Sequence, residues 1–141
     1  MLTKSRWQHL IPHHGAMCLL ENVTAWDDTR IHATAISHRD AANPLRSNGI
    51  LRAVHLCEYG AQAMAVHGGL LAQRDGRAAA PGMLVSLRAV KLHVARLDDL
   101  PGDLDVHADK LLDGGASWQY AFRVELGGRL LAQGRAAVMT R

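Results

Sequence analysis

The sequence contains only two cysteines, and neither belongs to a cysteine-based framework. Cys18 and Cys57 are far apart and lack Cys-x-x-Cys spacing. This excludes a disulfide scaffold and a cysteine-ligated zinc site, so both residues are expected to be small core side chains. The HEXXH motif is also absent, and His55 with Glu58 alone would supply too few ligands. We therefore expect no metal site.

Aromatic residues are scarce, at 4% of the chain. They do not interleave with the scattered arginines as base-stacking platforms would, and the formal net charge is only +3. Nucleic-acid binding is therefore not expected. A mildly basic enzyme could instead use a local patch to receive an acidic carrier protein.

Long apolar runs are missing too, since no run could span a bilayer. The segment 1–15 lacks the apolar region of a secretory signal peptide. We therefore expect no membrane partner and a cytoplasmic location. A chain of 141 residues with 48% hydrophobic content fits one globular domain over residues 1–141.

The most informative stretch runs from Asn43 to Leu71. Turn signals at its start open into a long helix-compatible segment, and Gly68-Gly69 are expected to mark the far end. The apolar residues of this segment lie on every side of the predicted helix, which is typical of a buried helix. His55, Glu58 and Gln62 nevertheless fall within a sector of roughly 60°. A carboxylate in such a stripe needs a partner, a proton or a catalytic task.

The rest of the chain reads as a short helix and several strands. Residues 83–97 carry apolar side chains on both alternate sets, which favours a central, covered strand. Together the patterns predict two short strands, one long buried helix and a four-stranded meander, with a sheet that curls around the helix. The predicted elements are a helix at 4–10, strands at 17–26, 30–36, 83–97, 104–112, 118–126 and 130–139, and loops at 37–48 and 73–81.

Four motifs occur in a fixed order along the chain. They are Ile11-Pro12-His13 leading into a strand, Asn43-Pro44-Leu45, Glu58-Tyr59-Gly60-Ala61-Gln62, and Pro101-Gly102-Asp103. In this order they resemble the hotdog fold, an α+β architecture in which an antiparallel sheet wraps a long central helix. The chain is most similar to the 3-hydroxyacyl-acyl carrier protein (ACP) dehydratases, and within them to the dehydratase-like proteins of aryl polyene pathways.

The resemblance implies that the chain removes water from a 3-hydroxyacyl thioester to give a trans-2-enoyl thioester. The substrate would be carried on the phosphopantetheine of ACP or on coenzyme A, with no other cofactor. In the family, a loop histidine takes the C2 proton, the helix carboxylate serves the C3 hydroxyl, and backbone N–H groups at the helix N-terminus polarise the thioester carbonyl. Glu58 carries over as the carboxylate and Gln62 as the residue one turn on. The implied substrate-binding residues are Met17, Asn43, Leu45, Ser47, Gly49 and Gln62.

The chain departs from the family pattern at the loop histidine, because Leu45–Gly49 contains none. In the family the site lies between two subunits, as a homodimer or heterodimer. Three alternatives follow: His13, His38 or His55 is the base; a second hotdog chain supplies a histidine to Glu58; or the chain is a non-catalytic partner subunit. An acyl-thioester hydrolase on the same fold is a further alternative, in which the helix carboxylate activates water.

Two groups of charged or titratable residues have more than one interpretation. Glu58 could be an acid in a buried tunnel, or it could form an ion pair with Arg52 or Arg88. The cations of the long predicted strand could bind a phosphopantetheine phosphate or an acidic carrier, or they could form a solvated strand face. These cations are Arg88, Lys91 and Arg96, and the histidines expected on strand surfaces are His32, His93 and His107.

Overall fold

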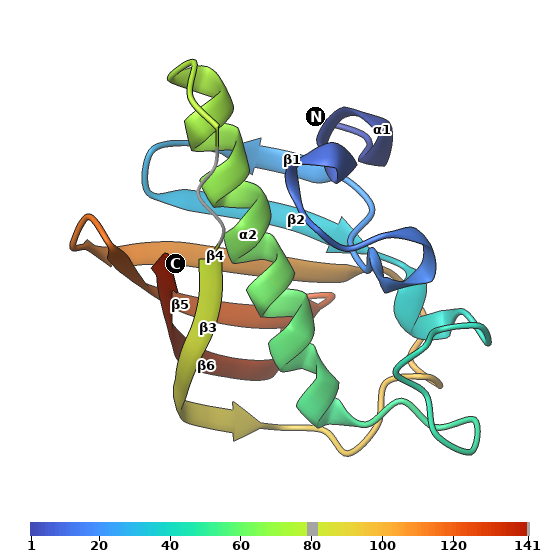
Figure 1. Ribbon diagram of the computed structural model, residues 1–141. Coiled ribbons are helices and arrows are strands. Elements are labelled where there is room, and N and C mark those ends of the chain that lie inside the picture. The colour runs from blue at the N-terminus through green and yellow to red at the C-terminus, as the bar shows by residue number, and fades with distance from the viewer. Residues whose placement is uncertain (79–81, 141) are drawn as a thin grey trace.

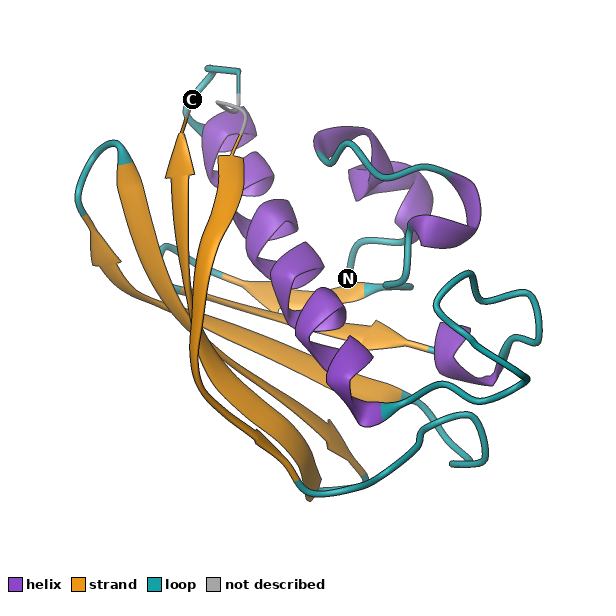
Figure 2. Cartoon of the chain, turned by 60° about the horizontal axis from the view of Figure 1, so that its bottom comes forward, coloured by secondary structure: helices purple, strands orange, loops and turns teal. Residues whose placement is uncertain are grey.

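A computed structural model describes residues 1–78 and 82–140. One six-stranded antiparallel sheet curls around one side of a long helix, α2 (Figures 1 and 2), so the hotdog architecture is confirmed. The strands are β1 (Val23–Trp26), β2 (Arg30–Ala35), β3 (Gly82–Leu92), β4 (Leu104–Asp113), β5 (Ser117–Leu126) and β6 (Arg129–Thr140), and the helices are α1 (Lys4–Trp7) and α2 (Leu56–Arg74). Short 3₁₀ turns span Gln8–Leu10, Gly15–Met17, Ser37–Arg39 and Ala53–His55.

Helix α2 is buried along most of its circumference, as its apolar sequence predicts. The expected end at Gly68-Gly69 is wrong, because the helix continues to Arg74. Gly69 instead allows a close contact, since a Cβ there would lie 2.8 Å from Cβ of Leu10. Gly60 does the same for β5, where a Cβ would lie 2.7 Å from the ring of Phe122. The less buried face of α2 carries small side chains, at Cys57, Ala61, Ala65 and Gly68.

The sheet order β1-β2-β4-β5-β6-β3 differs from the predicted four-stranded meander. Of the four strands after α2, only β4, β5 and β6 lie side by side in sequence order, whereas β3 pairs with β6 and β4 pairs with β2. After α2 the chain therefore enters the sheet at its far edge. The predicted hairpins at Asp27-Asp28 and Gly127-Gly128 are confirmed. The first strand is shorter than predicted, because Gly15–Met17 forms a 3₁₀ turn and β1 begins only at Val23.

Strand β3 is an edge strand, not the covered central strand that its apolar pattern predicts. Its apolar side chains lie between 37% and 48% exposed. An apolar strand at an edge shows the same sequence pattern as a central one, because both are made to be covered on two faces. The exposed residues are Met83, Leu84, Val85, Leu87, Val90 and Leu92. The β3 edge therefore leaves a row of apolar side chains exposed.

The N-terminal segment packs across α2 and leads toward its start. Trp7 is fully buried, and its indole N–H donates to the carbonyl of Glu21 at 3.1 Å. Leu10 then contacts Gly69 of α2. These contacts fix the path of residues 11–19 along the helix. Among the described residues, no helix is long and apolar enough to cross a membrane, and no group of three potential ligands could hold a metal ion.

Candidate active site

Glu58 and His13 form the central pair of the candidate site. Glu58 lies in the first turn of α2, where the helix dipole favours a negative charge. His13 reaches it from the N-terminal loop, and its Nε2 lies 3.2 Å from Oε1 of Glu58. The two side chains are 29% and 34% exposed, so both are accessible from outside the chain. The partner of Glu58 is thus His13, and not Arg52 or Arg88.

The two ring nitrogens of His13 have different surroundings. Nε2 faces Glu58. Nδ1 is enclosed and has no hydrogen-bond partner within residues 1–78 and 82–140. The pair therefore brings an imidazole and a carboxyl group, each able to donate or accept a proton, to within 3.2 Å of each other.

Gln62 joins the helix to the loop that carries the histidine. Its side chain is fully buried one turn after Glu58. Its Oε1 accepts the backbone N–H of Leu19 at 2.9 Å, and its Nε2 donates to the carbonyl of Met17 at 2.6 Å. The same Nε2 lies 3.4 Å from Oε1 of Glu58. Gln62 therefore fixes both the loop and the carboxylate, as the i, i+4 spacing predicts.

Asn43 belongs to a buried hydrogen-bond network that includes Tyr59, the residue next to Glu58. It is buried, and its Nδ2 donates to the carbonyl of Ser37 at 2.9 Å and to the hydroxyl of Tyr59 at 3.2 Å. The Tyr59 hydroxyl also lies 2.8 Å from Oγ of Ser37, which in turn donates to the carbonyl of Leu19. Burial raises the pKa of Tyr59, so this network is held by a neutral phenol. Sequence reasoning missed Tyr59 and Ser37, although Tyr59 directly follows Glu58 in its motif.

The loop that lacks the family histidine is a tight hairpin at the surface. Ser47 and Ile50 exchange two backbone hydrogen bonds, of 2.9 and 3.0 Å, around Asn48-Gly49. Both central residues have positive φ, of 53° and 75°, as an Asn-Gly two-residue turn requires. Ser47 and Gly49 are exposed, whereas Leu45 packs partly against the core.

Of the three candidate histidines, only His13 contacts Glu58. His38 is fully buried, and its Nε2 lies 3.2 Å from the carbonyl of Leu100. Burial lowers the pKa of His38, which keeps the imidazole neutral. His55 immediately precedes α2 and is half-buried. No ion pair or hydrogen bond joins it to Glu58 within the described part of the chain.

The cations expected to bind phosphate fall into two groups. Arg96 contacts Asp98 through a short ion pair and Asp99 at 3.7 Å, so it is already neutralised. The Arg96 guanidinium holds the pKa of Asp98 far below its usual range. Arg88 and Lys91 lie on β3 and form no ion pair with any described residue.

Comparisons with known proteins identify the family of the chain. A family model for the ApeP-like proteins, described as ApeP dehydratase, matches residues 5–141. The structure of the dehydratase heterocomplex ApeI:P from Xenorhabdus doucetiae is similar with a TM-score of 0.86 and 26% identity, covering 100% of this chain and 92% of that one. No curated protein sequence matches the chain.

More distant structures share the fold. A hypothetical thioesterase with coenzyme A from Streptococcus pneumoniae has a TM-score of 0.62 and 13% identity, over 85% of this chain and 84% of that one. AziG of S. sahachiroi has a TM-score of 0.60 and 21% identity, over 93% and 97% of the two chains. The match of the family model over nearly the whole length places this chain in the ApeP-like dehydratase family.

Proposed function

We propose that the chain is a 3-hydroxyacyl-ACP dehydratase subunit that uses His13 and Glu58 as its acid–base pair. The observation that carries this proposal is the 3.2 Å contact between Nε2 of His13 and Oε1 of Glu58. A histidine thus stands beside the helix carboxylate even though the family's loop histidine is absent. This contact favours a catalytic subunit over a non-catalytic one.

Each proton in the proposed elimination has a place in the pair. Neutral His13 accepts the C2 proton at Nε2, the C2–H and C3–O bonds break, and the C2=C3 double bond forms. Protonated Glu58 delivers its proton to the departing hydroxyl, which leaves as water. The proton gained by His13 then passes to Glu58 across the 3.2 Å contact between them. The pair ends with the number of protons with which it began.

The acyl chain would lie against the loops around this pair. Met17 presents its backbone to Gln62 beside the site, and Leu45, Ser47 and Gly49 lie on the loop that precedes the helix. We propose these residues as substrate contacts. Asn43 would act indirectly, because its amide is bonded to Ser37, Leu45 and Tyr59.

We further propose that a second hotdog subunit covers the exposed β3 edge and completes the site. An open strand of this length, lined with exposed apolar side chains, needs a covering partner. The similar Xenorhabdus protein lies in a heterocomplex, which supports a heteromeric partner here. The less buried face of α2 carries the small side chains of Cys57, Ala61 and Ala65, which leave room for another chain beside Glu58.

The decisive experiment is turnover of 3-hydroxyacyl-ACP, followed by intact mass, with and without the second subunit of the Xenorhabdus complex. Loss of one water is expected, and Glu58→Gln and His13→Asn should each abolish it. Glu125→Gln and His9→Asn are matched controls that keep full activity, since neither residue contacts the pair. Release of free acid and thiol would instead identify a hydrolase, and absence of turnover in all mixtures would refute the proposal.

A further inference from the structure

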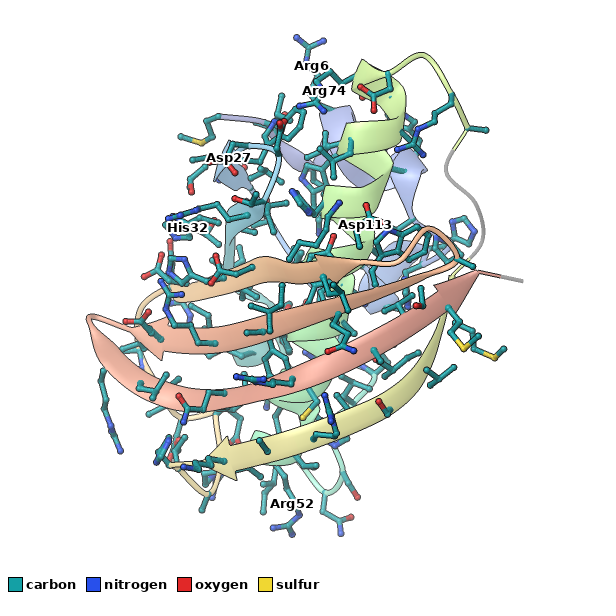
Figure 3. The ribbon with its side chains drawn as sticks, turned by 90° about the vertical axis from the view of Figure 1, so that its left-hand side faces the viewer. Arg6, Asp27, His32, Arg52, Arg74 and Asp113 are labelled. Carbon is teal, nitrogen blue, oxygen red and sulfur yellow. The ribbon has the colours of Figure 1, made fainter. Side chains whose placement is uncertain are left out.

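The outer face of the β3 edge carries positive charges that form no ion pair with the residues that the structure describes. Arg88 pairs in register with Arg135 of β6, and Lys91 pairs with Gln133. Residues opposite each other in an antiparallel pair share a face. Arg88, Lys91 and Arg135 are exposed, and none forms an ion pair or a side-chain hydrogen bond with a described residue. We name these three residues the basic strip (Figure 3 looks onto this face, with β3 as the lowest strand).

Charges elsewhere on the same face are balanced. Arg123 of β5 contacts Glu125 at 2.9 Å and Asp109 at 3.5 Å. His32 contacts Asp105 at 2.8 Å, and its ring stacks on His107 at a centroid distance of 4.2 Å. The carboxylates nearest the centre of the sheet are therefore already engaged by their own neighbours. The unbalanced charge is confined to the strands at the β3 edge.

The opposite face of the same strand is apolar. Leu87 and Leu92 pair with the buried residues Ala136 and Ala132, so they point to the helix side of the sheet. Both leucines are 41% exposed, because β3 stands last in the sheet order. The edge thus combines an uncovered apolar inner face with an unpaired cationic outer face. A strand that pairs here must cover the first and neutralise the second.

A second copy of this chain meets only half of this requirement. In an antiparallel pair, cross-strand neighbours on one face lie about 5 Å apart and diagonal neighbours about 7–8 Å apart. Self-pairing centred between residues 89 and 90 of β3 would therefore place Arg88 of each copy opposite Lys91 of the other. Like charges in these positions destabilise the pair. Cationic edge residues are also a common device against unwanted strand pairing.

We propose that the basic strip selects a hotdog partner whose edge strand carries carboxylates on its outer face, and disfavours the homodimer. This inference rests on the proposed heteromeric function and specifies the chemistry of the partner. The apolar inner face supplies the attraction, whereas Arg88 and Lys91 determine which edge strand is accepted. Arg135 adds to the positive potential from the second strand.

The test uses an acidic-edge copy of this chain, Arg88→Glu/Lys91→Glu, as the partner. Sedimentation velocity is measured for the wild type, the variant and their equimolar mixture. The mixture should associate roughly tenfold or more tightly than either protein alone, because two or more like-charge contacts become opposite-charge contacts. The advantage should shrink when NaCl is raised from about 50 mM to about 500 mM, because salt screens these contacts.

Two controls keep the test decisive. Arg6→Glu/Arg129→Glu has the same net charge change at exposed residues outside β3 and beyond its pairing with β6, and should give no preference for the mixture. The neutral variant Arg88→Gln/Lys91→Gln removes the repulsion without adding carboxylates and should self-associate several-fold more tightly than the wild type.

Equal association of wild type, variant and mixture at low salt would overturn the inference. So would unchanged association together with weaker binding of acidic ACP by the acidic-edge copy, since the strip would then be a carrier site. These measurements report association and not turnover, so they remain valid if the chain proves inactive as a dehydratase.

Discussion

A histidine with its polar contacts lies near each end of helix α2, and we call each such group a cluster. The two clusters differ in whether both ring nitrogens of the histidine have a polar partner among the described residues. Near the start, His13 contacts Glu58 through Nε2, while its Nδ1 is unpartnered among the described residues. Near the far end, His67 is fully buried with both nitrogens bonded, Nδ1 to the hydroxyl of Tyr120 at 2.8 Å and Nε2 to the carbonyl of Asp27 at 2.7 Å. Residue types alone would not distinguish them.

We propose opposite roles for the two histidines because their bonding patterns differ. A carbonyl can only accept, so Nε2 of His67 carries its proton and Nδ1 accepts the proton of Tyr120. Burial lowers the pKa of His67 and raises that of Tyr120, so both stay neutral. A saturated, enclosed network of this kind stabilises the fold and has no proton to exchange. The partly exposed His13–Glu58 pair at the other end is the one that we propose exchanges a proton.

The first prediction separates the roles by activity. His13→Asn should lower the rate of dehydration by about 10²- to 10⁴-fold, which is the usual contribution of a positioned general acid or base. Its free energy of unfolding should change by no more than about 0.5 kcal/mol, because the side chain is partly exposed. Steady-state kinetics and urea unfolding measure the two quantities. A variant that loses stability but keeps its rate would reverse the assignment.

The second prediction concerns the sealed cluster. His67→Leu should destabilise the protein by about 2–4 kcal/mol, because it leaves the buried Tyr120 hydroxyl and Asp27 carbonyl without partners. Adding Tyr120→Phe removes one of the orphaned groups. The double variant should therefore lose less stability than the sum of the single changes. Additive losses in urea unfolding would show that the two side chains are not coupled.

The third prediction links the two ends through the N-terminal segment. Gly69→Ala would place a Cβ 2.8 Å from Cβ of Leu10. Leu10 precedes His13 by only three residues in the sequence. Overpacking of this kind typically costs about 1–3 kcal/mol. We expect that loss in thermal or urea unfolding, with an activity loss smaller than that of His13→Asn. Gly68→Ala is the matched control, because nothing lies within 4 Å of a Cβ there.

The sequence predicts the local part of the site better than the tertiary part. Glu58 and Gln62 are one turn apart on a helix, so their proximity follows from spacing alone. The choice among His13, His38 and His55 does not. His13 meets Glu58 because Leu10 packs on Gly69 and Gln62 binds the carbonyl of Met17. Neither contact leaves a periodic pattern in the sequence.

The fold shows the same division. The buried helix and the clean alternation of β5 are predictable because each depends on its own residues. The position of β3 depends on which strand lies next to it, and its apolar pattern fits both a central strand and an edge that awaits a partner. Its cations, Arg88 and Lys91, are the sequence features that distinguish the two, since unpaired charges are rare inside a sheet.

The final and smallest effect is on the pH dependence of stability. Burial lowers the pKa of His67 and of His38 in the folded chain, whereas the unfolded chain titrates near the ordinary value of about 6.5. Below that pH the unfolded state binds more protons than the folded state. The contribution of these neutral histidines to the free energy of unfolding is therefore fully present above about pH 6.5 and is lost as the pH decreases. Each histidine contributes a slope of at most about 1.4 kcal/mol per pH unit.

Urea unfolding at about pH 7.5, 6.5 and 5.5 measures this loss across the titration range of histidine. His67→Leu should flatten the slope by the contribution of one proton, because burial lowers the pKa of His67 in the folded chain. The sealed histidine then couples folding to pH. An unchanged slope in His67→Leu would mean that enclosure does not favour the neutral form of His67, which would remove the physical basis for describing its network as sealed.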